Sequence, residues 1–339
     1  MLKAYMHRRE RYLAMLNDDR LVRPFAWGSE FLGLNTNGPD MAESPGEAIR
    51  KYAAEAFKNS DKFFHLPEIA DFNLQEDLLT WTSAVETPTK ENNIARARFF
   101  PAKVGRSAVI VLPHWNAREG SYFDLCRVLN RVGLSALRLT LPYHEERRET
   151  QDARADHIVS ANIGRTLQSV RQAVLDTRAA VRFLKEQGYE KVGIVGTSIG
   201  SCTAFLATAH DTGIDAGVYN HVSGYFADVV WRGLSTYHVR EGLEDNITLD
   251  ELRDYWLPIS PLPYLDKLKA FPRPLKFIYT LYDLTFPYDL SLQVREAVTK
   301  AKIPASFSWL PCGHYTLGEK PWNYLDGFKI ISFFRRHLK

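Results

Sequence analysis

The sequence predicts an α/β fold with a mostly parallel central sheet of about eight strands and helices on both faces. Apolar runs of strand length alternate with segments of helical periodicity from residue 78 onward. Several runs, such as SAVIVLP at 107–113, are apolar throughout, which is typical of strands buried on both faces. The first two runs instead alternate polar and apolar residues around ETPTKEN, which predicts an antiparallel leading hairpin.

Each predicted element follows from its local pattern. Glycines at 133 and 188 end the helical segments 121–133 and 166–188, and a third helix is expected over 200–211. A fourth helix closes the chain with NYLDGFKIISFFRRHLK. The strands are predicted at 78–85, 93–102, 107–113, 134–142, 191–196, 216–224, 275–282 and 305–311. Residues 1–75 mix amphipathic helical stretches with turns, so we expect an N-terminal helical extension before a main domain over 76–339.

Composition excludes several classes of protein. The net charge is only +3, with 43 basic residues against 40 acidic ones, so no nucleic-acid-binding surface is predicted. The three cysteines do not suggest a disulfide framework and fit a reducing compartment. No run approaches the roughly 20 apolar residues of a membrane span, and the charged N-terminus lacks the apolar core of a signal peptide. We therefore expect a cytoplasmic protein, and the oligomeric state stays open.

A serine between two glycines stands at a strand–helix junction. VGIVGTSIGSC contains G-x-S-x-G at Gly196, Ser198 and Gly200, directly after an apolar run and before a small-residue helix. This pattern indicates a sharp, strained turn that lifts the serine hydroxyl above the carboxyl edge of the sheet. The following helix N-terminus then points its free N–H groups at whatever the serine attacks. The alternative is a glycine-rich turn with an incidental serine.

A serine nucleophile needs a base and an orienting acid. In this architecture both should follow later strands, in the order serine, acid, histidine. Asp283 comes just after LKFIYTLY, and His314 just after ASFSWLP. Taken singly, they could be a turn-capping carboxylate and a loop histidine, but together with Ser198 they predict a catalytic triad. His221 is expected inside a strand, where a core role is favoured.

The chain resembles the α/β-hydrolase superfamily, on GTSIG after a strand, YDLTFP and LPCGHYTL. The resemblance covers residues 78–339 and is greatest to bacterial carboxylesterases and dienelactone-hydrolase-like enzymes. It implies Ser198 as nucleophile, His314 as general base and Asp283 as orienting acid. It also implies a lid-like insertion over 225–272. No metal, nucleotide or redox cofactor is implied, and neither G-x-x-x-x-G-K-[ST] nor G-x-G-x-x-G occurs.

The loop after the third strand departs from the family pattern. It reads VLPHWNAREG, where His114 matches the family's histidine and Trp115 replaces the expected glycine. An oxyanion hole needs backbone N–H donors, and these do not depend on the side chain. Ile199 should supply one donor, and either Trp115 or Asn116 the other. The indole of Trp115 could wall the acyl pocket or simply pack in the interior, and His114 could touch the substrate.

Further substrate contacts are expected on two segments. In LPYHEERR, His144 and Arg147 could line the substrate entrance, or the loop could be charged and solvated. In the lid-like segment, apolar and aromatic residues including Tyr225, Phe226, Val230 and Trp231 could line the cavity, or they could be core contacts of surface helices.

The predicted function is that of a serine hydrolase, which cleaves a carboxylic ester of a small molecule through an acyl-enzyme. An amidase, peptidase, thioesterase or acyltransferase would use the same triad, since only the leaving group or acceptor differs. A non-catalytic binding protein on this fold is the alternative from a different class.

Overall fold

The sheet is built outward from strands that are buried on both faces. The computed structural model describes residues 1–16, 18–34 and 43–339. In these residues, nine strands form one sheet in the order β1-β2-β3-β5-β4-β6-β7-β8-β9. Their bounds are β1 (Asn73–Gln75), β2 (Leu78–Thr82), β3 (Ile94–Phe100), β4 (Ser107–Leu112), β5 (Ser135–Thr140), β6 (Lys191–Thr197), β7 (Ala216–Asn220), β8 (Leu275–Thr280) and β9 (Ala305–Leu310).

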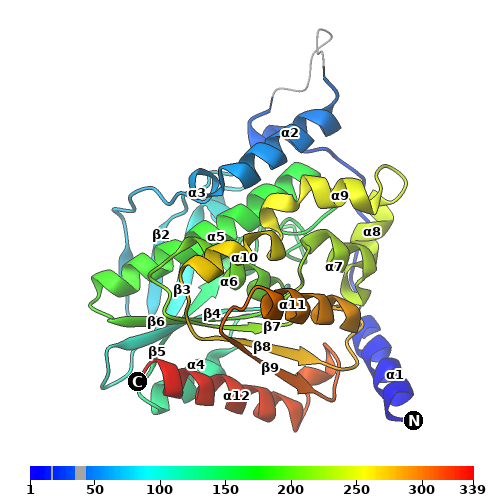
Figure 1. The fold of residues 1–339 in the computed structure, drawn as a ribbon. Coiled ribbons are helices and arrows are strands. Elements are labelled where there is room, and N and C mark those ends of the chain that lie inside the picture. Colours follow the sequence, from blue (N-terminus) through cyan, green and yellow to red (C-terminus); the bar gives the residue numbers. More distant parts are fainter. Residues whose placement is uncertain (17, 35–42) are drawn as a thin grey trace.

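The helices cover both faces of this sheet. Helices α4 and α12 lie on one face, and α5, α6, α10 and α11 lie on the other (Figure 1). The helices are α1 (Leu2–Met15), α2 (Pro45–Lys58), α3 (Ser60–Phe63), α4 (Phe123–Arg131), α5 (Ile163–Glu186), α6 (Ile199–His210), α7 (Phe226–Arg232), α8 (Tyr237–Leu243), α9 (Leu249–Tyr255), α10 (Leu265–Ala270), α11 (Tyr288–Lys300) and α12 (Trp322–His337).

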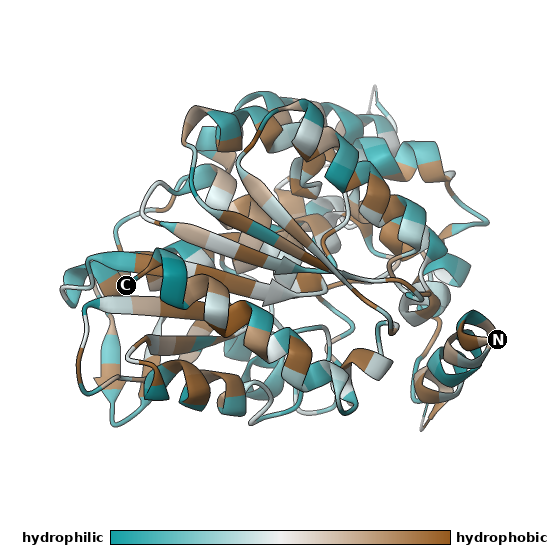
Figure 2. Ribbon diagram, turned by 60° about the horizontal axis from the view of Figure 1, so that its bottom comes forward, coloured by the Kyte–Doolittle hydropathy of each residue, from teal (hydrophilic) through white to brown (hydrophobic). Residues whose placement is uncertain are grey.

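Burial follows the periodicity of each strand. All residues of β5 and β7 are buried, whereas β3 alternates between buried and partly exposed positions, because only one of its faces meets the core. Apolar residues run along the central strands, and polar residues gather on the outer turns of the helices (Figure 2). Among the helices that the structure describes, none is long and apolar enough to cross a membrane.

The predicted fold class is confirmed, including the antiparallel leading hairpin of β2 and β3. The sequence prediction missed the short edge strand β1, whose three residues are all exposed and therefore carry no apolar signal. From β5 through β9 every neighbouring pair is parallel. The carboxyl ends of β4, β6, β7, β8 and β9 therefore lie along one edge, where ligands bind in open α/β sheets.

The structure corrects both expectations for Arg147, which lies neither at a substrate entrance nor in solvent. Its side chain is fully buried and forms an ion pair of 2.9 Å with the equally buried Asp176 of α5. It also donates hydrogen bonds to the carbonyl oxygens of Asn92 and Thr140. The guanidinium thus ties the loop after β5 to helix α5, because a buried charge requires paired and hydrogen-bonded partners.

Replacing Arg147 should destabilise the fold, because Asp176 would be left as an unpaired buried charge. We expect Arg147→Met to lower the free energy of unfolding by about 3–5 kcal/mol in urea denaturation. Arg148→Met is the matched control, since Arg148 makes one exposed hydrogen bond, to the carbonyl of Ala153, and should change stability by less than about 0.5 kcal/mol. Equal losses in the two variants would contradict the role given to the ion pair.

Candidate active site

Ser198 occupies a strained turn between β6 and α6. Its backbone has φ 58° and ψ −124°, a conformation that non-glycine residues rarely adopt. Thr197, the last residue of β6, pairs with Asn220 of β7, and the N–H of Ser198 donates to the carbonyl of Asn220 at 2.9 Å. Strained backbone of this kind clusters at functional sites, where the surrounding structure holds it in place.

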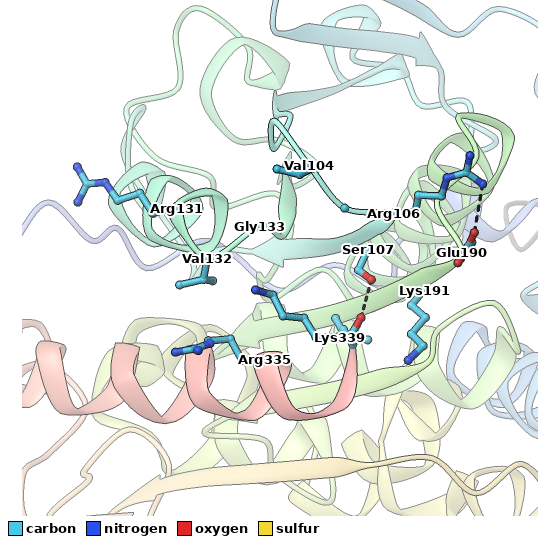
Figure 3. Close-up of a pocket in the computed structure, with 12 residues that line it drawn as sticks. Val104, Arg106, Ser107, Arg131, Val132, Gly133, Glu190, Lys191, Arg335 and Lys339 are labelled. Atoms are coloured by element: carbon cyan, nitrogen blue, oxygen red, sulfur yellow. Dashed lines mark hydrogen bonds and ion pairs between the residues drawn. The ribbon is translucent and has the colours of Figure 1, made fainter.

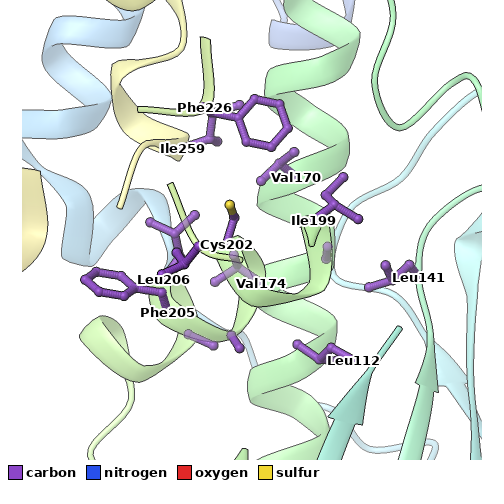
Figure 4. Close-up of a cluster of buried hydrophobic side chains, with 14 of the residues drawn as sticks. Leu112, Leu141, Val170, Val174, Ile199, Cys202, Phe205, Leu206, Phe226 and Ile259 are labelled. Carbon is purple, nitrogen blue, oxygen red and sulfur yellow. The ribbon is translucent and has the colours of Figure 1, made fainter. Parts of the chain in front are cut away.

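The two flanking glycines allow this turn to form. A Cβ at Gly196 would overlap the carbonyl of Gly200, and a Cβ at Gly200 would lie only 2.6 Å from the carbonyl oxygen of Leu112. Helix α6 therefore begins in direct contact with the backbone at the end of β4. Behind the turn, Ile199 and Cys202 pack against Val170 and Phe226 in the buried cluster of Figure 4.

Asp283 is a buried carboxylate just after β8 that holds His314. Its Oδ1 accepts the N–H groups of Thr285 and Phe286 at 2.8 and 2.7 Å. Its Oδ2 lies 3.2 Å from His314 Nδ1 and accepts the Thr280 hydroxyl at 3.2 Å. Burial alone would raise the pKa of Asp283, but the charge of His314 and the hydrogen bonds of His221 and His314 lower it far below its usual range, so this group stays ionised.

His314 is held in one orientation. Burial acts to lower its pKa, but the charge of Asp283 and the hydrogen bond to it raise the pKa above 6.5, with a further contribution from the charge of Glu10. Its ring stacks on Phe286, with centroids 5.5 Å apart and an interplanar angle of 8°. With Nδ1 directed at Asp283, Nε2 is left as the proton acceptor.

His221 is a third member of this cluster that the sequence prediction assigned only to the core. It is buried as expected, but it follows β7 rather than lying within it, and its Nδ1 lies 3.0 Å from Asp283 Oδ2. Burial lowers its pKa, so it is neutral. His221 stands at the carboxyl end of β7, between β6, which precedes Ser198, and β8, which precedes Asp283. This position is the sequence signal that could have identified it.

His221, Asp283 and His314 also offer one potential metal-ligand atom each, and these atoms lie within 4.8 Å of one another. The hydrogen bonds of Asp283 use both of its oxygens, one on backbone N–H groups and the other on His314 and Thr280. The hydrogen-bond donors around Asp283 therefore suit a carboxylate that lies between two imidazoles and orients the base.

Ser198 and His314 open into one cavity of about 750 Å³. Ser198 Oγ forms no hydrogen bond with the described residues, as is common for catalytic groups without a ligand. The cavity wall is largely apolar, but two arginines also line it. Besides the serine and the histidine, it includes Arg20, His114, Trp115, Asn116, Tyr122, Leu125, Arg154, Val159, Ile199, Phe226, Val229, Val230, Phe286, Leu317, Asp326 and Ile330.

The loop after β4 is fixed from several sides. The N–H of Asn116, which has a positive φ of 57°, donates to His144 Nε2 at 2.9 Å. The other ring nitrogen of His144 lies 2.9 Å from the carbonyl of Pro142, so Nδ1 must carry the proton. Trp115 is held by a hydrogen bond from its indole to the Ala155 carbonyl. The N–H of Asn116 is therefore already bonded within the protein.

Solved structures share this arrangement of strands and helices. The acylaminoacyl peptidase of Pyrococcus horikoshii matches over 80% of this chain with a TM-score of 0.58 and 15% identity. An esterase of Pyrococcus furiosus matches over 82% of this chain and 95% of its own, with a TM-score of 0.51 and 14% identity. A puromycin-hydrolysing peptidase of Mycobacterium tuberculosis matches over 72% of this chain, with a TM-score of 0.56 and 18% identity.

This chain has the α/β-hydrolase fold. At these identities the likeness concerns the fold, and the chain spans about half of the length of the acylaminoacyl peptidase and 37% of the length of the puromycin-hydrolysing peptidase. No protein-family model matches the sequence, and no curated protein matches it.

The α/β-hydrolase fold brings most of the predicted site together, but four of the predicted substrate contacts, Arg147 among them, lie elsewhere. His114 and Trp115 are in the cavity wall. His144 is outside the wall: only 2% of its surface is exposed, and it binds the loop after β4. Tyr225 and Trp231 are not among the described residues of the wall, whereas Phe226 and Val230 of α7, which the sequence also suggested, line it together with Val229. Of these three residues, the sequence prediction did not name Val229, and its place three positions after Phe226 on the same helix face is the signal that would have selected it.

A second hollow of about 760 Å³ lies away from this edge. It is lined by Arg131, Lys191, Arg335, Lys339 and neighbouring residues near the start of β4 and β6 (Figure 3). Its described lining includes Ser107 and Glu190 but no histidine, so it lacks the base that the first cavity has.

The close approach of α6 to β4 predicts a sharp difference between two helix glycines. We expect Gly200→Ala to lower the free energy of unfolding by about 3 kcal/mol, since the methyl group would meet the backbone oxygens of Leu112 and Pro113. Gly327→Ala, in α12, is the control, because nothing lies within 4 Å of its Cβ position. It should stabilise the helix by about 0.5–1 kcal/mol. Thermal unfolding of both variants measures this, and a tolerated Gly200→Ala would disprove the tight contact.

Proposed function

We propose that this protein is a serine hydrolase that cleaves carboxylic esters through an acyl-enzyme, with Ser198, His314 and Asp283 as its triad. One observation carries the proposal: a serine on a strained strand–helix turn shares a cavity with a histidine whose Nδ1 is held by a buried, ionised carboxylate. The fold shared with known esterases and peptidases supports the reaction class but does not select the ester.

In the proposed mechanism, Ser198 Oγ attacks the substrate carbonyl while His314 Nε2 takes its proton. Asp283 keeps the imidazole in the required tautomer and stabilises the imidazolium. The developing oxyanion accepts hydrogen bonds from the N–H groups of Ile199, at the start of α6, and Trp115. His314 then gives its proton to the leaving alcohol, and water releases the acid by the same steps in reverse.

His144 has a supporting role in this proposal. By accepting the N–H of Asn116, it fixes the turn that presents the N–H of Trp115 to the oxyanion. Burial lowers the pKa of His144 to about 3, so it stays neutral and keeps Nε2 free to accept.

The cavity favours short to medium acyl chains. Its volume of about 750 Å³ is that of a site for one small molecule. Apolar residues of α4, α7 and α12 line it. Each buried methylene adds about 0.8 kcal/mol of binding free energy at most, so affinity should rise with chain length until the cavity is filled.

The triad predicts that Ser198→Ala abolishes hydrolysis with the fold intact. The loss in kcat should be on the order of 10⁴-fold or more. The measurement is kcat/KM along p-nitrophenyl esters from acetate to palmitate, together with labelling by a fluorophosphonate probe. The wild type should be labelled and should prefer esters shorter than palmitate. Activity of the variant within tenfold of wild type would refute the nucleophile. An unlabelled wild type would favour a binding protein.

The environment of His314 predicts the pH dependence. The base must be neutral, and its raised pKa places the acidic limb of kcat/KM above pH 6.5. Because the pKa of Asp283 is lowered, this acid should add no second step near neutral pH. Asp283→Asn should reduce the plateau and move the limb to lower pH. EDTA should leave the wild-type profile unchanged, and loss of activity on chelation would favour a metal held by His221, Asp283 and His314.

A further inference from the structure

The N-terminal helix reaches the loop that carries His314. Helix α1 lies beside the carboxyl ends of β8 and β9 (Figure 1) and contacts the short 3-10 helix Thr316–Gly318. Its buried residues are Met6, Glu10 and Ala14, which recur every four positions and so share one face. A glutamate with no exposed surface therefore stands in the middle of this docking face.

The carboxylate of Glu10 binds the backbone directly after the predicted base. One oxygen accepts the N–H of Tyr315 at 3.0 Å, and the other accepts the N–H of Thr316 at 2.8 Å. A Cβ at Gly313 would collide with the Glu10 carboxyl group, so the glycine before His314 makes room for it. Glu10 thus binds the chain directly after the histidine and lies against the glycine directly before it.

A second residue of the N-terminal segment, Arg20, binds the loop that carries His314. The Arg20 guanidinium donates to the Tyr315 hydroxyl at 2.9 Å. Ser235 lies 2.7 Å from that hydroxyl and 2.7 Å from the hydroxyl of Thr285, in the loop of the orienting acid. The N-terminal segment, the histidine loop and the acid loop are therefore linked by consecutive hydrogen bonds.

The burial of Glu10 is costly unless its charge has a counterpart. Among the described residues, no lysine or arginine forms an ion pair with it, and both of its oxygens act as acceptors, as in a carboxylate. The titratable groups that interact electrostatically with His314 are Asp283, His221, His114 and Glu10, and Arg20, Tyr315 and Asp326 line the same cavity. Burial lowers the pKa of His114 and His221, so neither adds a positive charge. The imidazolium of His314 is thus the cation that faces Glu10.

We propose that Glu10 is a positioning residue of the catalytic site, which anchors the His314 loop from helix α1 and places a second carboxylate behind the base. The proposal rests on the function proposed for Ser198 and His314. A glutamate that only fastened the helix would affect stability alone, whereas a positioning carboxylate must also affect how His314 titrates. Burial raises the pKa of Glu10 itself, and its backbone hydrogen bonds oppose that shift.

The test is the rate at which a fluorophosphonate labels Ser198 in the full-length protein, from about pH 5 to about pH 9. This rate needs the base but no knowledge of the natural substrate. In Glu10→Gln, we expect the plateau rate to fall roughly tenfold as the loop loosens. The midpoint should move to lower pH by about half a unit to one unit, since a negative charge near the imidazolium is lost.

Glu319→Gln is the matched control. Glu319 forms an ion pair with Arg9 of helix α1, but both side chains are 37% exposed. This variant removes an equal charge from the helix contact without touching the histidine, so rate and midpoint should equal those of wild type. A midpoint that stays in place in Glu10→Gln, or that moves equally in Glu319→Gln, would overturn the proposal.

Glu10→Asp covers the case in which Glu10→Gln does not fold. It keeps the charge but cannot reach both N–H groups, so the plateau should fall while the midpoint stays near that of wild type. A plateau equal to wild type would overturn the positioning role. If wild type itself is not labelled, with Ser198→Ala as the blank, the proposed function fails and the role of Glu10 fails with it. A labelled wild type with an unmoved midpoint in Glu10→Gln refutes Glu10 alone.

Discussion

The contact between the start of α6 and the end of β4 constrains everything built above the sheet. Two backbones meet there so closely that Gly200 can carry no side chain, and the chain that leads from β6 into α6 must turn at Ser198 with a positive φ. This geometry places the serine hydroxyl and the first N–H groups of α6 on the same side of the sheet edge. The strain is sustained because α6 is buried along nearly its whole length.

Hydrogen bonds within and between loops, rather than the sheet itself, position the other residues of the site. Asp283 accepts two N–H groups of its own loop before it reaches His314, so its carboxylate is oriented in advance. His144 does the same for the loop after β4 by accepting the N–H of Asn116. Groups that are held before the ligand arrives need no reorganisation during reaction, which is the physical basis of electrostatic catalysis.

Local patterns predicted the fold and the order of Ser198, Asp283 and His314, because strand ends and turn glycines are visible in sequence. The burial of charged residues was not predictable in this way. Arg147 stands in a charged run that favours solvent, and only its contact with α5 makes it a core residue. Glu10 belongs to a helix rich in charges, and nothing nearby in the sequence marks it as buried. In both cases the partner lies far along the chain, where periodicity carries no information.

The docking of α1 also makes the stability of the site distinct from the stability of the sheet. The hydrogen bonds of Glu10 join positions 305 and 306 residues apart, so almost the whole chain must be closed into a loop for them to form. Ordering the helix costs conformational entropy, and the helix offers little apolar burial in return, since Leu2, Tyr5, Tyr12 and Met15 stay exposed. Such an element is among the last to assemble and the first to detach. A molecule whose sheet is fully formed can therefore still hold an unaligned histidine.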